Sequence, residues 1–146
     1  MRPKPLVLVV DDEKSLVLIA ERVLQKEGFD VITASNGAEG LKKAQENLPD
    51  VIVLDIVMPE MNGYEVCQKL QANMNTCGIP VIFLSVKGTV DENKSPTNEG
   101  LKEINEAFNR GASDFLNKPV TARELIDAIK KALSFHRILS SGKTTL

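Results

Sequence analysis

The chain has 146 residues, of which 42% are hydrophobic and 26% are charged, which is typical of a single globular domain with one hydrophobic core. Its net charge of −2 lacks the basic excess of proteins that bind nucleic acid directly or lie on anionic membranes, and its apolar stretches fall short of the roughly 20 residues of a membrane-spanning helix. Residues 1–5 are too few, and their charged side chains come too soon, for a signal peptide, so we expect a cytoplasmic protein.

Strand and helix patterns alternate five times along the chain. The first, third and fourth apolar runs are nearly continuous, which is typical of strands covered on both faces of a parallel sheet. The predicted strands are, in chain order, residues 6–10, 31–34, 51–54, 81–84 and 113–116. Because strands alternate with helices, we expect right-handed crossovers and a sheet with helices on both sides. The sequence therefore predicts a fold of the α/β class.

The helices are predicted from apolar side chains that recur at intervals of three and four residues. Gly28 indicates the end of the first helix and Pro49 the end of the second, since glycine favours the turn after a helix and proline cannot continue one. Thr121 and Glu124 form a capping-box sequence that begins the fifth. The apolar stripes of the five helices span residues 16–24, 38–48, 64–70, 101–108 and 125–133.

Two segments have no periodic pattern. Residues 87–100 are polar and predict a long loop, and loops of this length are usually functional or disordered. We expect this loop to contribute to the choice of partner rather than to chemistry. Residues 140–146 predict a flexible tail. The sequence therefore divides into a domain at 1–139 and a tail at 140–146.

Polar side chains follow four of the five predicted strands. They are Asp11 and Asp12 after the first strand, Asp55 after the third, Ser85 after the fourth and Lys118 after the fifth. Each alone could be a helix cap or a loop residue. Ligands of open α/β sheets bind beyond the carboxyl ends of the strands, so we expect these side chains to meet. An ionised carboxylate is costly to bury unless it is paired or metal-bound, and three carboxylates suit Mg²⁺.

These residues lie in motifs that resemble the receiver domain of two-component response regulators, from about residue 6 to about residue 139. The motifs are Val-Val-Asp11-Asp12, Leu-Asp55-Ile-Val-Met-Pro59, Gly63, Leu-Ser85, and the run from Gly111 to Pro119. The resemblance implies a flavodoxin-like, doubly wound sheet of five parallel strands in the order 2-1-3-4-5, flanked by five helices.

The resemblance also implies a phosphorylation-activated signalling switch rather than an enzyme acting on other molecules. Asp55 would accept a phosphoryl group from a sensor histidine kinase or a histidine phosphotransfer protein. Asp12 and Asp55 would hold one Mg²⁺ together with the backbone carbonyl of Val57. Asp11 would act mainly through a metal-bound water. Lys118 would pair with Asp55 before the reaction and with a phosphoryl oxygen afterwards.

The resemblance further assigns the signalling step. Ser85 would donate its hydroxyl to a phosphoryl oxygen, and Phe115 would then turn inward as a two-state element. The face made by the helix at 101–108, the strand at 113–116 and the helix at 125–133 would signal to a downstream protein partner or output domain. The same face would mediate a homodimer, if one forms. We expect no direct contact with nucleic acid or membrane.

The sequence departs from the pattern of the family beside the site. Phe115 stands where tyrosine is common, so a contact through a tyrosine hydroxyl is absent. Val86 stands where a small residue is usual in the family, and it should crowd the approach to the phosphoryl group. In the family, the residues two places after the phosphoacceptor Asp and two places after the Ser flank the path of an attacking water. Here they are Val57 and Lys87, and Val57 has no hydrogen-bonding group to orient the water. We therefore expect a long-lived phosphoryl group. The loop at 87–100 is longer than the family norm.

Other classes of protein fit this sequence less well. A phosphatase that forms an aspartyl phosphate also carries an Asp after a strand, but it needs a second Asp two residues later, where this chain has Val57. A nucleotide-binding module needs a glycine-rich turn after the first strand, which this sequence lacks. A receiver-like module that only binds partners without being phosphorylated is disfavoured because all five site residues are retained.

Overall fold

The computed structural model describes residues 3–85 and the backbone of 112–142, with side chains from 114 to 134 in the second segment. Five parallel strands form one sheet in the order β2-β1-β3-β4-β5. They are β1 Leu6–Val10, β2 Asp30–Ala34, β3 Val51–Asp55, β4 Val81–Ser85 and β5 Ala112–Asn117. The predicted fold class and strand order are confirmed, and no predicted strand differs from the observed one by more than one residue at either end.

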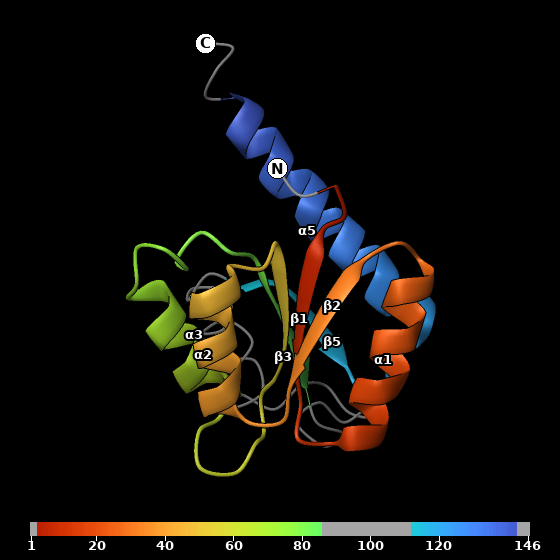
Figure 1. Cartoon of the computed structure of the whole chain (residues 1–146), viewed down its shortest axis with the longest axis vertical. Coiled ribbons are helices and arrows are strands. Elements are labelled where there is room, and N and C mark those ends of the chain that lie inside the picture. The colour runs from red at the N-terminus through yellow and green to blue at the C-terminus, as the bar shows by residue number, and fades with distance from the viewer. Residues whose placement is uncertain (1–2, 86–111, 143–146) are drawn as a thin grey trace, which may run out of the picture.

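Four helices in the described segments cover the two faces of the sheet (Figure 1). They are α1 Lys14–Lys26, α2 Gly37–Asn47, α3 Gly63–Gln71 and α5 Ala122–Gly142. The predicted helix at 101–108 and the predicted loop at 87–100 lie outside the described residues. Helix α5 continues to Gly142, three residues past the predicted end of the domain at 139.

Alternate strand residues divide the core into two layers, because successive side chains of a strand point to opposite faces. Leu8 and Leu54 pack under α2 and α3. Val9 and Val53 pack under α1 and α5. All four are at most 1% exposed. Burial on both faces explains why β1 and β3 read as continuous apolar runs rather than as alternating patterns.

The predicted helix ends are formed by local hydrogen bonds. After α1, Gly28 adopts a positive φ of 96°, a region that favours glycine. At the start of α5, the backbone N–H of Glu124 donates to Thr121 Oγ1 at 3.1 Å, and that of Thr121 donates to Glu124 Oε1 at 3.4 Å. The predicted capping box is therefore confirmed.

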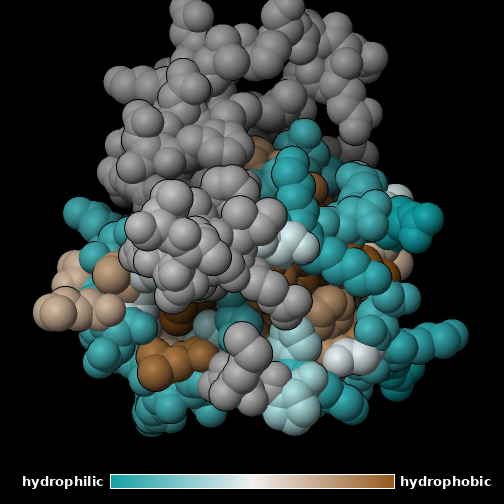
Figure 2. Space-filling model, turned by 90° about the horizontal axis from the view of Figure 1, so that it is seen from above, coloured by the Kyte–Doolittle hydropathy of each residue, from teal (hydrophilic) through white to brown (hydrophobic). Residues whose placement is uncertain are grey.

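The surface of the described residues is mainly polar in the view of Figure 2. Figure 2 views the molecule from above Figure 1 and shows mostly hydrophilic side chains on the described surface, with smaller hydrophobic areas between them. Within the described segments, no helix is both long enough and apolar enough to cross a bilayer.

Candidate functional site

The carboxyl ends of β1 and β3 bring three aspartates together at one edge of the sheet. These strands are neighbours, with Val10 opposite Leu54, so the residues at their ends are also close. Asp11 and Asp55 are each 1% exposed, whereas Asp12 is exposed. One carboxylate oxygen from each aspartate lies within 4.8 Å of the others. The fold therefore assembles the acidic cluster that the sequence predicts.

Lys118 reaches this cluster from the turn after β5. Its Nζ lies 2.8 Å from Asp11 Oδ2 and 3.5 Å from Asp55 Oδ1. Its backbone N–H donates to the carbonyl of Ser85 at 3.1 Å, which ties the turn to the end of β4. The peptide bond between Lys118 and Pro119 is cis. The expected pairing with Asp55 is present, but the shorter contact is with Asp11.

The pKa of Asp55 is raised to about 7, chiefly by burial and then by the adjacent charge of Asp11, against the opposing effect of Lys118. Burial by itself lowers the pKa of Lys118, but its contacts with Asp11 and Asp55 outweigh that effect, so the pKa rises overall. Lys118 thus carries a positive charge between two buried carboxylates. The ionised form of Asp55 would gain from a further positive charge.

The buried oxygens of the cluster fit a cation. Asp11 Oδ2 and Asp55 Oδ1 accept no hydrogen bond from the described residues, although the ammonium of Lys118 lies near both. The other oxygen of Asp11 accepts from the backbone N–H of Glu13 at 2.9 Å. Carboxylate oxygens crowded in this way are the ligands that hard divalent cations prefer. The three aspartates could therefore hold such an ion.

Ser85 lies at the end of β4 and is 1% exposed. Its hydroxyl donates to Oδ1 of Asn117, which stands opposite it in the register of β4 and β5. Sequence reasoning assigned no role to Asn117. The available signal was its position immediately before Lys118, but its pairing with Ser85 depends on the register of two strands that are distant in sequence.

The loop between β3 and α3 lies close against the end of β3. The backbone N–H of Gly63 donates to the carbonyl of Ile56 at 2.7 Å, and a Cβ at Gly63 would lie 2.4 Å from the carbonyl oxygen of Asp55. Only glycine permits this approach. Val57 lies in the same loop and is 55% exposed.

The predicted switch residue, Phe115, is half-buried on β5. It stands opposite Phe83 in the register of β4 and β5 and packs against the core layer beneath α2 and α3. Val86 and Lys87, which the sequence places beside the site, lie outside the described residues.

Comparisons with known proteins agree with this arrangement. Residues 7–130 match the family model described as "Response regulator receiver domain". The chain is 39% identical over 127 residues to the alkaline phosphatase synthesis transcriptional regulatory protein PhoP of Bacillus subtilis, covering 87% of this chain and 48% of that protein. It is 36% identical over 124 residues to protein PilG of Pseudomonas aeruginosa, covering 85% and 84%.

A solved structure shares the fold. The response regulator receiver domain protein from Clostridium thermocellum superposes with a TM-score of 0.79 at 31% identity, over 92% of this chain and 98% of that one. The chain spans about half the length of most of the curated relatives it matches, such as PhoP. Because the family model covers most of the chain and the acidic cluster lies where the motifs place it, the chain belongs to the receiver domain family of two-component response regulators.

Proposed function

We propose that this receiver domain is switched by phosphorylation of Asp55 in a Mg²⁺-dependent reaction. The observation that carries the proposal is the convergence of Asp11, Asp12, Asp55 and Lys118 at one edge of the sheet. A cluster of carboxylates next to one lysine suits phosphoryl transfer, in which catalysis consists mainly of positioning and of stabilising charge.

Asp55 is better placed than Asp11 to act as the nucleophile. One oxygen of Asp11 accepts from the backbone N–H of Glu13, and the other lies 2.8 Å from Lys118. Asp55 Oδ1 lies farther from the same lysine, at 3.5 Å, and like Asp11 Oδ2 it accepts no hydrogen bond from the described residues. An oxygen with fewer partners loses less when it forms a new bond.

The phosphodonor is a phosphohistidine of a sensor histidine kinase or a histidine phosphotransfer protein. A carboxylate oxygen of Asp55 attacks the phosphorus, a P–O bond forms, and the P–N bond to the imidazole breaks. The imidazole nitrogen keeps the electron pair and takes up a proton from water. Lys118 then pairs with a phosphoryl oxygen.

Asp12, Asp55 and the backbone carbonyl of Val57 would hold the Mg²⁺, with Asp11 contributing through a water. When bound, the ion supplies positive charge against the carboxylates and the incoming phosphoryl oxygens. The buried oxygens of Asp11 and Asp55 that accept no hydrogen bond support a cation at this cluster.

The signal passes through β4 and β5. The hydroxyl of Ser85 leaves Asn117 for a phosphoryl oxygen, and Phe115 turns inward beside it. The pairing of Ser85 with Asn117 at the ends of these strands, two residues beyond Phe115 on β5, supports this coupling. The receiver then acts on a downstream partner or on an output domain, in keeping with relatives named as transcriptional regulators that are about twice as long. The face that includes β5 and α5 is the proposed contact for that partner or for a homodimer.

The test is the intact mass of the protein after incubation with Mg²⁺ and acetyl phosphate. The wild type should gain one phosphoryl group, and Asp55→Asn should gain none. Asp127→Asn, an exposed change on α5, serves as the control and should behave as the wild type. A full adduct on Asp55→Asn would refute the assignment of the acceptor.

A further inference from the structure

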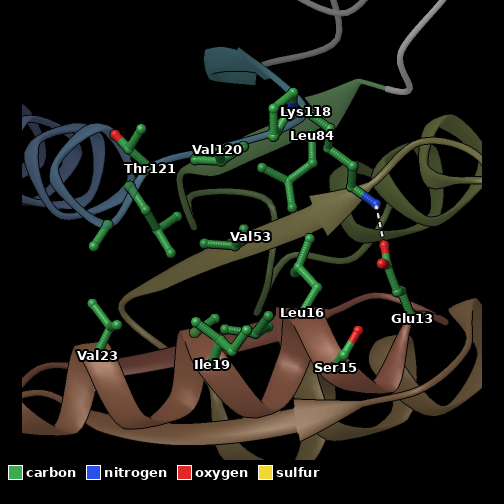
Figure 3. Close-up of a pocket in the computed structure, with 15 residues that line it drawn as sticks. Glu13, Ser15, Leu16, Ile19, Val23, Val53, Leu84, Lys118, Val120 and Thr121 are labelled. Atoms are coloured by element: carbon green, nitrogen blue, oxygen red, sulfur yellow. Dashed lines mark ion pairs between the residues drawn. The ribbon is translucent and has the colours of Figure 1, made fainter.

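Lys118 lies close to a third carboxylate that the proposed site does not use. Glu13 Oε2 is 3.8 Å from Lys118 Nζ, compared with 2.8 Å for Asp11 and 3.5 Å for Asp55. Figure 3 shows this ion pair at the end of a cavity of about 470 Å³ between α1 and the start of α5. Glu13 comes from the wall formed by α1, and Lys118 comes from the opposite wall.

Glu13 occupies a position where a different residue would serve the helix better. It is the N-cap of α1, and its side chain makes no capping hydrogen bond. Short polar residues are preferred there because their oxygens accept from the first turn. The side chains of Asn36, Asn62 and Thr121 cap α2, α3 and α5 in this way. Departures from local rules are expected at functional sites, which makes Glu13 a candidate for a role in this one.

The backbone of Glu13 is fixed relative to the acidic cluster. Its N–H donates to Asp11 Oδ1 at 2.9 Å, and its carbonyl accepts from Val17 at 3.2 Å in the first turn of α1. The side chain is 58% exposed, while that of Lys118 is 16% exposed. Glu13 can therefore attract the lysine from the solvent side while Asp11 and Asp55 attract it from the buried side.

We propose that Glu13 is a positioning residue that competes with Asp55 for the ammonium of Lys118 in the unphosphorylated protein. The inference rests on the proposed role of Lys118 as the partner of a phosphoryl oxygen. While Glu13 holds the lysine toward solvent, the lysine is less available to an incoming phosphoryl group and repels a cation at the aspartates less strongly. Exposed ion pairs of this kind shift equilibria by about two- to fivefold.

The first test measures the rate of Asp55 phosphorylation by acetyl phosphate at saturating Mg²⁺. We expect Glu13→Gln to be about two- to fivefold faster than the wild type. Glu13→Asp keeps the charge but is one methylene shorter, so it should lose the contact and resemble Glu13→Gln. Glu21→Gln, which removes a charge two turns further along α1, should leave the rate unchanged. If Glu13→Asp reacts at the wild-type rate, the charge acts only through its general field and the inference is wrong.

The second test does not depend on phosphoryl transfer, so it separates failure of this inference from failure of the proposed function. Titration of Mg²⁺ should show an affinity about two- to fivefold weaker for Glu13→Gln, because Lys118 then settles nearer the aspartates. In a Lys118→Met background the same change should have no effect. An equal loss of affinity with and without Lys118 would overturn the inference. Urea unfolding of each variant checks that the fold is retained.

Discussion

Replacing Asp55 by asparagine should stabilise the metal-free protein at mildly alkaline pH. Asp55 is 1% exposed, and its burial next to Asp11 raises its pKa from 3.8 to about 7. A shift of that size corresponds to at most about 4 kcal/mol of destabilisation when the group is ionised. The substitution also removes a contact with Lys118 at 3.5 Å, which opposes the gain. We therefore expect a net increase in the free energy of unfolding of about 1–3 kcal/mol.

The pH dependence has a definite sign. Because the pKa of Asp55 is higher in the folded state than in the unfolded chain, the folded state holds the proton more tightly between 3.8 and about 7. The stability of the wild type should therefore fall as the pH rises through that window and level off above it. The Asp55→Asn variant should lack this slope, and the gain over the wild type should shrink toward the acid end of the window.

The assay is urea denaturation followed by far-UV circular dichroism, with a chelator present, across this range of pH. Asp12→Asn is the control, because that aspartate belongs to the same cluster but is exposed and should change the stability by less than about 0.5 kcal/mol. Added Mg²⁺ should stabilise the wild type more than the Asp55→Asn variant. The reasoning fails if the metal-free variant is no more stable than the wild type at alkaline pH, or if it keeps the slope.

Three further outcomes are expected. Gly63→Ala should lower the free energy of unfolding by about 2–4 kcal/mol, because its Cβ would lie 2.4 Å from the carbonyl oxygen of Asp55. Gly78→Ala is the control, since the space around Gly78 is open and the substitution should change the free energy of unfolding little. Urea denaturation of both variants tests this. Asp12→Ala should weaken Mg²⁺ binding in a calorimetric titration, and an unchanged affinity would place the metal elsewhere. Val57→Asn should speed the loss of the phosphoryl group roughly tenfold, because an amide can orient an attacking water. The rate is measured from the decay of the phosphorylated protein by intact mass. If the wild-type protein loses its phosphoryl group as fast as the variant, the prediction is wrong.

Features that depend on neighbouring residues could be predicted from the sequence. The continuous apolar runs of β1 and β3 reflect burial on both faces of the sheet, so the strands and the α/β class follow from pattern alone. The end of α1 near Gly28 and the start of α5 at Thr121 follow from the chemistry of one or two residues. The positions of the aspartates after strands also follow, because the carboxyl ends of parallel strands lie at one edge.

Only the tertiary structure decided how the charges of the site are shared. That Lys118 lies nearer to Asp11 than to Asp55, and that Glu13 lies 3.8 Å from it, depends on the order of the strands and the course of the turn after β5. Lys118 is far in the sequence from Asp11, Glu13 and Asp55, and side-chain distances of a few ångströms arise from packing between elements rather than from the pattern within any one of them. Electrostatic energies change steeply over such distances, so the balance at this site could be determined only in the folded chain.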